Sequence, residues 1–238
     1  MSSTRTDATV VAAGVAQVAK LIANGPRAVM LDLLMDGQSH PAGVLAREAG
    51  VAPSTASGHL GALADRGLVT IEQVGRQRRY RLSGPEVAHA MESLAALAPT
   101  IGISSLRQAT KVEQLRRART CYDHLAGRLG VAVTERLVSG RALRRTGEAF
   151  ELTRSGRTLL EGIGVDVDGA RRRKRRFALA CQDWTERRSH LGGALGAALC
   201  DRLIELAWIR RRPGGRAVIL TDEGTERLAS SLGVELEP

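Results

Sequence analysis

The stretch from residue 44 to residue 82 constrains the fold most, because its hydrophobic period changes there from helical to alternating. A first helix is expected from Pro41 to Ala49. Pro41 suits the first turn of a helix, and Gly50 can adopt the left-handed conformation that ends one. A tight turn then leads to Pro53, where a second helix begins. Two short helices joined by a tight turn predict a helix-turn-helix.

The second helix has an apolar side and a small, polar start. Ala56, Leu60 and Leu63 recur at helical spacing and are expected to pack inward. Small polar residues at the helix start suit contact with base edges in the major groove of DNA. A histidine beside Leu60 is more often a packing or phosphate-contacting residue than a chemical group. The predicted recognition helix contributes Pro53, Ser54, Thr55, Ser57, Gly58 and His59.

An alternating segment follows and predicts a β-hairpin. Val69 and Ile71 alternate on its first strand, Gly75 turns the chain, and Tyr80 and Leu82 share one side of the return strand. A hairpin after a helix-turn-helix forms the wing of a winged helix, and cations at its tip suit contacts with phosphates. The predicted wing contacts are Arg76, Gln77, Arg78 and Arg79.

The same stretch resembles the ArsR-type family of bacterial winged-helix repressors. The matching motifs are A-G-V-x-x-S-x-x-S-x-H-L-x-x-L at 49–63, G-L-V at 67–69 and G-R-x-x-x-Y-R-L at 75–82. The resemblance implies that the recognition-helix residues read base edges, that the arginine hairpin touches DNA and that the flanking helices form a homodimer. Gly58 departs from the long polar residue often found at its position in the family.

Helical patterns flank the motif at residues 7–23, 26–35 and 85–97. By the resemblance, the first and last of these pair with their symmetry mates in the dimer. We expect a mainly α fold with small β-hairpins. It has a winged helix-turn-helix DNA-binding and dimerisation domain at 1–98, a linker at 99–105 and a C-terminal regulatory, effector or assembly domain at 106–238.

The second half contains an internal repeat, in which residues 124–167 match residues 190–236. His124 matches His190, and a Leu-Thr-x-x-Gly motif occurs in both copies. Each copy is expected to form a helix, a short hairpin and a closing helix. The C-terminal domain is therefore predicted to consist of two repeated helix-hairpin-helix units about a pseudo-dyad.

Cysteine and histidine residues make a metal site one interpretation of the second half. Cys121 and His124 are expected one helical turn apart, where Cys181, Asp183 and His190 can approach them across the pseudo-dyad. The Cys-x-x-His spacing is weak and buried cysteines often pack as apolar residues, so no metal is assigned. The family's usual metal positions also lack matching ligands, because residues 39–44 contain no cysteine. The weak metal candidates are Cys121, His124, Cys181 and His190.

An organic effector is the competing interpretation, because half of the aromatic residues lie near the two repeat histidines in sequence. Aromatic and polar groups together suit a small-molecule pocket, although two tryptophans can equally fill a core that is short of aromatics. The candidate effector site comprises Cys121, Tyr122, His124, Cys181, Asp183, Trp184, His190 and Trp208.

The net charge of +10 favours a polyanionic partner. Residues 1–105 are nearly neutral, with 9 Lys+Arg against 8 Asp+Glu, so the excess lies in the second half. Six consecutive cations at 171–176 are expected to begin a helix that Asp166 caps and that continues to Trp184. This basic run is either a solvated helix start or an auxiliary phosphate contact.

The remaining signals favour a binding protein over an enzyme. The sequence has no G-x-S-x-G, P-loop, dinucleotide or H-E-x-x-H motif. Three cysteines and no signal or transmembrane pattern predict a cytoplasmic protein with reduced thiols and no membrane partner. No cofactor is expected beyond an unknown small-molecule or metal effector.

These observations predict a sequence-specific DNA-binding transcriptional regulator, a homodimeric, effector-responsive repressor on an inverted-repeat operator of double-stranded DNA. One alternative is an architectural protein that binds DNA nonspecifically. A less favoured alternative is a thiol- or metal-dependent enzyme with a DNA-binding domain. Salt dependence separates the first two, because nonspecific binding is nearly all counterion release.

Overall fold

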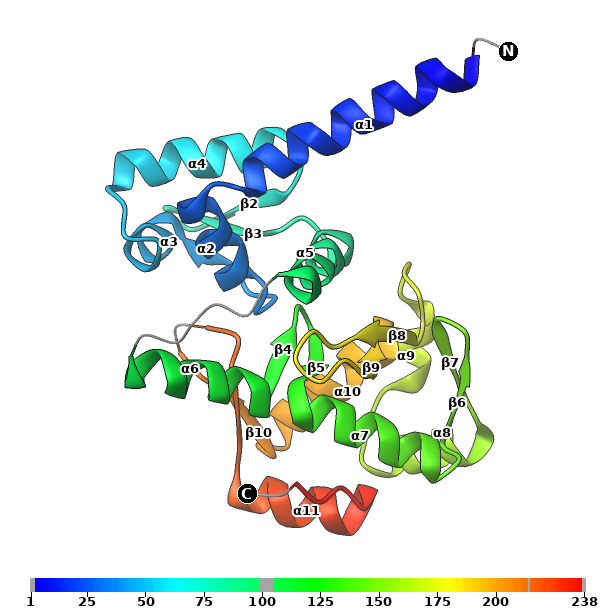
Figure 1. Ribbon diagram of the computed structural model, residues 1–238. Coiled ribbons are helices and arrows are strands. Elements are labelled where there is room, and N and C mark those ends of the chain that lie inside the picture. The colour runs from blue at the N-terminus through cyan, green and yellow to red at the C-terminus, as the bar shows by residue number, and fades with distance from the viewer. Residues whose placement is uncertain (1–2, 99–104, 214, 237–238) are drawn as a thin grey trace. The chain divides into compact units, whose positions relative to one another are not determined.

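The computed structural model describes residues 3–98, 105–213 and 215–236, and the chain separates into two compact units, Met1–Val87 and Ala88–Pro238 (Figure 1). The division falls inside α5 (Pro85–Leu97), which the sequence predicts to lie wholly in a domain at 1–98. Glu92 of α5 is buried with two arginines of the second unit, which accounts for the difference. The expected linker at 99–105 lies outside the described residues, except for Ser105.

The first unit consists of helices around a small antiparallel sheet with strand order β1-β3-β2. In Figure 1, the first half of the blue helix α1 extends beyond the other elements of this unit. The elements before α5 are α1 (Ser3–Ile22), α2 (Gly25–Leu34), β1 (His40–Pro41), α3 (Ala42–Glu48), α4 (Pro53–Asp65), β2 (Val69–Val74) and β3 (Gln77–Leu82).

Local sequence signals account for these elements, and the predicted winged helix-turn-helix is confirmed. The Asn24 side chain accepts a hydrogen bond from Arg27 N at 3.2 Å and begins α2. Gly50 has φ +66° after α3, and Gly75 has φ +60° in the hairpin turn. A core of aliphatic side chains holds the helices on the sheet, and burial of each contributes about 1.5–3 kcal/mol. Its fully buried members include Met30, Leu31, Leu34, Leu45, Leu60, Leu63 and Leu82.

The second unit begins with the C-terminal part of α5 and α6 (Leu106–Arg117), whose N-cap is Ser105. From β4 onward, the order hairpin, helix, hairpin, helix occurs twice, with α9 between the two halves. The first half contains β4 (Arg119–Cys121), β5 (His124–Ala126), α7 (Gly127–Ser139), β6 (Leu143–Thr146), β7 (Ala149–Leu152) and α8 (Arg154–Gly162). The rest contains α9 (Val167–Arg172), β8 (Leu179–Gln182), β9 (Ser189–Gly192), α10 (Gly193–Glu205), β10 (Ile209–Arg211), β11 (Val218–Leu220) and α11 (Asp222–Leu232).

The two halves exchange their strand pairings. In the sheet β6-β7-β8-β9, the later hairpin of the first half pairs with the earlier hairpin of the second half, at Ala149 and Leu179. The reverse contact is a bridge between Arg119, at the start of β4, and Ala217, which precedes β11. Each half therefore completes the sheet edge of the other.

Two arginines also cross between the halves. Arg202 of α10 donates from Nε to the Ile163 carbonyl at 2.8 Å and lies against Gly164, which follows α8. Arg136 of α7 lies against Gly233, which ends α11. A Cβ at Gly233 would lie 2.5 Å from Arg136 Nη2, so a side chain at this left-handed position would displace the arginine.

Two helical expectations are wrong in this unit. Cys121 and His124 lie opposite each other on β4 and β5, because Tyr122, with φ 63°, turns the chain sharply between them. The basic run does not continue a helix to Trp184, since α9 ends at Arg172 and β8 follows. Like charges four residues apart repel each other on a helix, which disfavours its extension.

Asp166 caps α9 as expected, accepting a hydrogen bond from Gly169 N at 2.7 Å. Across the described ranges of the chain, none of the helices has the length and apolarity that a membrane span requires.

Candidate DNA interface and a buried cysteine-histidine cluster

The start of α4 presents an exposed, polar surface. Ser54, Thr55 and Ser57 are exposed beside Pro53, while Ala56 faces the core. The N-cap residue of α4 is an alanine, which makes no side-chain cap, so the first backbone N–H groups of α4 are free of a capping oxygen. Such a helix start suits an anionic ligand as well as base edges.

Gly58 and His59 of α4 differ in their surroundings. A Cβ built at Gly58 meets nothing within 4 Å, so packing within the chain does not require glycine there. His59 is half-buried, and its Nδ1 lies 3.3 Å from Arg27 Nη1 on α2. His59 therefore contacts another helix of its own unit, whereas Gly58 leaves room for a surface that approaches α4.

The wing arginines have unequal roles. Arg76 lies in the turn and Arg78 on β3, and both are exposed, as is Gln77. Arg79 instead donates from Nε to Ser39 Oγ at 3.1 Å and from Nη2 to the Ser39 carbonyl. The cations that face outward at the tip are thus Arg76 and Arg78, and Arg79 holds the segment that leads into β1.

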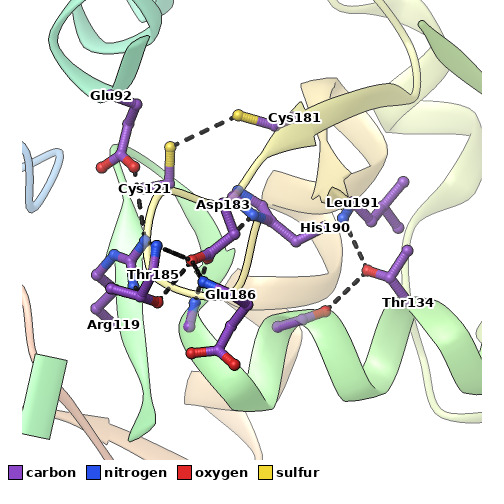
Figure 2. Close-up of polar contacts among 12 residues, drawn as sticks. Glu92, Arg119, Cys121, Thr134, Cys181, Asp183, Thr185, Glu186, His190 and Leu191 are labelled. Atoms are coloured by element: carbon purple, nitrogen blue, oxygen red, sulfur yellow. Dashed lines mark hydrogen bonds and ion pairs between the residues drawn. The ribbon is translucent and has the colours of Figure 1, made fainter. Parts of the chain in front are cut away.

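In the second unit, two hairpins bring together the residues that we call the Cys-His cluster. Cys121 pairs with His124 across β4 and β5, and Cys181 pairs with His190 across β8 and β9. Their ligand atoms all lie within 4.8 Å of one another, and all four side chains are buried. Figure 2 shows Cys121 and Cys181 pointing toward each other, with a distance of 3.9 Å between the sulfur atoms.

Asp183 is not one of the four cluster residues, but its carboxylate lies next to the His190 ring, at 3.3 Å from Nδ1. Its carboxylate accepts hydrogen bonds from Gly127 N at 2.7 Å and from Thr185 Oγ1 at 2.7 Å, and it pairs with Arg119 at 3.0 Å (Figure 2). Burial alone would raise the pKa of Asp183, but the contact with His190, the charge of Arg119 and the Thr185 hydrogen bond hold it well below its ordinary value.

The thiol of Cys121 is neutral near pH 7. Its hydrogen bond with Cys181 and its burial raise the pKa of Cys121 to about 12. The charge of nearby His124 acts in the opposite direction and lowers this pKa.

The three aromatic candidates lie in different surroundings. Tyr122 lies in the turn between β4 and β5, Trp184 stacks under Arg119 at 4.9 Å, and Trp208 belongs to the main apolar core. Two surface hollows of this unit, one beside α9 and α10 and one beside α7, are lined by other residues. The organic effector stays a prediction.

The basic run is partly engaged within the protein. Arg175 pairs with Asp123 at 2.5 Å, Arg173 lies 3.8 Å from Asp201, and Arg171 stacks over Phe177 at 4.2 Å. These contacts support the interpretation of the run as a solvated segment near acidic neighbours.

Sequence reasoning missed the buried charges around the cluster. Arg119 pairs with Glu92 at 3.6 Å as well as with Asp183, and Arg216 also pairs with Glu92. One signal was present in the sequence: an aspartate follows each cluster cysteine by two residues, as Asp123 and Asp183.

A winged helix-turn-helix with an exposed polar recognition helix and outward cations on its wing defines a DNA-binding protein. The chain is 39% identical over 222 residues to the HTH-type transcriptional regulator YdfF of Bacillus subtilis, covering 93% of this chain and 98% of that protein. It is 35% identical over 115 residues to the HTH-type transcriptional regulator Rv0324 of Mycobacterium tuberculosis, covering 43% of this chain and 50% of the relative. No protein-family model matches the chain.

Among solved structures, the chain is similar to the homodimeric winged helix-turn-helix domain of Mb0332 from Mycobacterium bovis, with 32% sequence identity and a TM-score of 0.35. The aligned region covers 37% of this chain and 82% of the Mb0332 domain. The similarity to YdfF extends over almost the whole length of both proteins. The chain belongs to the family of HTH-type transcriptional regulators. The motifs at 49–63 and 75–82, which resemble the ArsR type, lie in its winged helix-turn-helix. The protein is a DNA-binding transcriptional regulator.

Proposed function

We propose that the protein is a homodimeric repressor that binds an inverted-repeat operator in a sequence-specific way. The observation that carries this proposal is the exposed start of α4 beside a wing whose Arg76 and Arg78 face outward. In this assignment Ser54, Thr55 and Ser57 read base edges, and the wing arginines contact phosphates. Two such units related by a dyad fit two half-sites in successive major grooves.

The apolar surface of α1 supports dimer formation. Val10, Val11 and Val15 are 66%, 65% and 63% exposed, so this part of α1 is left apolar without a cover from its own unit. Three neighbouring valines on one exposed helix favour a protein partner over solvent. We assign the second copy of the chain as that partner, with α5 contributing Leu94 and Leu97, which are also exposed.

The second unit is the regulatory part of the protein in this proposal. We infer that its two halves are an internal duplication. The Leu-Thr-x-x-Gly motif occupies equivalent positions, where Thr153 caps α8 and Thr221 caps α11. A duplicated domain with two reciprocal interfaces can bias the spacing of the DNA-binding units when an effector changes it.

The first experiment compares binding of the reduced full-length protein to DNA upstream of its own gene with binding to a scrambled duplex of equal length, at physiological salt. A preference of about a thousandfold or more for the upstream DNA would support an autoregulating repressor. Equal affinity for both duplexes across a series of scanned promoter fragments would refute sequence-specific repression.

The basic excess of the second half supports one other function, nonspecific architectural binding. In that case, the affinity for any duplex falls steeply with salt and no fragment is preferred. The same titration at several salt concentrations therefore separates the two functions.

A further inference from the structure

The Cys-His cluster draws equally on two hairpins that lie far apart in the sequence. The β4–β5 hairpin supplies Cys121 and His124, and the β8–β9 hairpin supplies Cys181 and His190. The exposed fractions of these residues range from 0% to 6%. Each hairpin thus delivers one thiol and one imidazole to the same buried point.

The spacing of the two thiols fits one shared metal ion. The sulfur atoms lie 3.9 Å apart. Two thiolates at about 2.3 Å from a tetrahedral Zn²⁺ lie about 3.8 Å from each other. A disulfide instead requires a sulfur–sulfur distance of about 2.05 Å. The distance between the sulfur atoms of Cys121 and Cys181 is therefore close to that of two corners of a tetrahedron and too long for a disulfide.

The imidazoles give an independent indication of a ligand. Nε2 of His124 and both ring nitrogens of His190 are buried without a hydrogen-bond partner. Leaving a buried polar atom unsatisfied costs about 1–3 kcal/mol, and such atoms are rare in folded proteins. A cation between the two rings would give Nε2 of each ring the partner that it lacks.

A carboxylate stands behind each imidazole. Asp123 Oδ1 lies 3.2 Å from His124 Nδ1, and Asp183 Oδ2 lies 3.3 Å from His190 Nδ1, the latter at ion-pair distance without hydrogen-bond geometry. A histidine that binds a metal commonly has a carboxylate at its other ring nitrogen, which orients the ring. This arrangement leaves Nε2 of both rings for the metal.

The charges around the cluster are balanced for a divalent ion. Asp123 is paired with Arg175, and Asp183 with Arg119. The carboxylates behind the rings are thus already neutralised by arginine. On binding, the two thiols would release their protons, and the resulting thiolates would compensate the charge of one divalent cation held also by two neutral imidazoles.

A glycine keeps the space beside the cluster open. A Cβ at Gly192 would lie 3.1 Å from His124 Nε2 and 3.2 Å from Cys181 Cβ. Any side chain at this position would press on two of the four residues. The absence of a side chain at Gly192 therefore allows the β4–β5 and β8–β9 hairpins to lie close together.

We propose that the Cys-His cluster binds one divalent cation of the Zn²⁺ type, with two cysteine and two histidine ligands. Thiolate and imidazole ligands select such cations over Mg²⁺ and Ca²⁺, which prefer oxygen. Four protein ligands and deep burial leave no open coordination position, which is the pattern of a structural or regulatory site and not of a catalytic one. The ion ties the first half of the second unit to the second half.

The test uses reduced, full-length protein stripped with a chelator and titrated with Co²⁺, a spectroscopic substitute for Zn²⁺. The expected result is one equivalent per chain, with the visible and charge-transfer absorption of a tetrahedral cobalt–thiolate centre, and displacement by Zn²⁺. Absence of saturable Co²⁺ binding would overturn the proposal. The proposal would also be overturned if the air-exposed protein formed a Cys121–Cys181 disulfide and the reduced protein then took up no metal.

Variants and X-ray absorption locate the site. Cys181→Ser is expected to lose the charge-transfer band, whereas Cys200→Ala, which changes a buried cysteine outside the cluster, is expected to keep full stoichiometry. Equal loss in both variants would contradict the assignment. If Cys181→Ser fails to fold, X-ray absorption of the Zn²⁺-loaded natural protein tests the site instead. The expected coordination shell has two sulfur and two nitrogen atoms, and a shell of oxygen atoms would overturn the proposed site. None of these readouts involves DNA, so they are independent of the repressor proposal.

Discussion

Arg119 and Asp183 form an ion pair that is fully shielded from solvent, with 3.0 Å between Arg119 Nη2 and Asp183 Oδ1 and both side chains 0% exposed. Removing one partner of such a pair leaves an uncompensated buried charge, which destabilises a protein by about 3–5 kcal/mol. We expect Asp183→Asn to lower the stability of the second unit by an amount of this order. Both tryptophans lie in that unit, so urea unfolding followed by tryptophan fluorescence measures it.

The matching control for this pair is the double variant Arg119→Met with Asp183→Asn. Each single change leaves the charge of the other residue without its partner. The double variant is therefore expected to lose less free energy of unfolding than the sum of the losses in the two single variants. Strict additivity in chelator-treated protein would contradict a direct interaction between the two side chains.

At the DNA interface, replacement of Thr55 is expected to affect specificity. A lost base contact is worth about 1–3 kcal/mol of discrimination, so Thr55→Ala should reduce the preference for the operator over scrambled DNA by about 5- to 150-fold. Affinity for scrambled DNA should stay the same. Titrations of both duplexes at one salt concentration measure the two quantities, and a parallel loss on both would remove Thr55 from the base-reading set.

The two neighbouring wing arginines are expected to differ. Arg78→Ala should weaken binding to all duplexes and reduce the salt slope by about one, because its side chain is exposed on the hairpin that we propose contacts phosphates. Arg79→Ala should instead speed amide hydrogen exchange in β1 and β3, since Arg79 holds Ser39. If Arg78→Ala speeds exchange as much as Arg79→Ala does, the division of roles between the two arginines is wrong.

The dimer surface that we propose on α1 is tested by introducing negative charge. Val11→Glu combined with Val15→Glu should convert the dimer to a monomer in sedimentation equilibrium without unfolding the chain, because both side chains are exposed. Val29→Glu on α2, where the valine is 44% exposed, is the matched control and should remain dimeric. Dissociation of the control alone would move the interface to α2.

Cys200 provides a prediction on thiol reactivity. Burial raises the pKa of Cys200 to about 12, so its thiolate is scarce at pH 8 and becomes abundant only near pH 12. In the folded protein at pH 8, Cys200 should resist iodoacetamide, whereas in urea it should react like a free cysteine. Mass spectrometry of the alkylated peptides measures both rates, and rapid labelling in the folded state would show that Cys200 is accessible.

The winged helix-turn-helix is predictable from sequence because its determinants are local. Helical spacing of Ala56, Leu60 and Leu63, glycines at the turns and strand alternation all act within about 40 residues, and they agree with one another. What the sequence does not reveal here is the separation of roles between Arg78 and Arg79. That separation depends on Ser39, which reaches the wing only through the pairing of β1 with β3.

The members of the Cys-His cluster can be named from sequence, but their geometry cannot. A separation of three residues between Cys121 and His124 fits one turn of a helix and also fits a hairpin with a two-residue turn. The hairpin that forms also takes part in long-range pairing, a bridge between Arg119 and Ala217, which no local pattern encodes. Long-range pairing also explains why the burial of Glu92 with Arg119 was missed.

The exchange of hairpins between the two halves has a consequence for how the chain folds during synthesis. The segment that pairs with β4 emerges from the ribosome almost 100 residues later, so contacts of high sequence separation must form before the second unit is complete. The winged helix, whose contacts are short in sequence, can fold while the rest of the chain is still being made. A nascent chain therefore has a DNA-binding module before it has the domain proposed to regulate it.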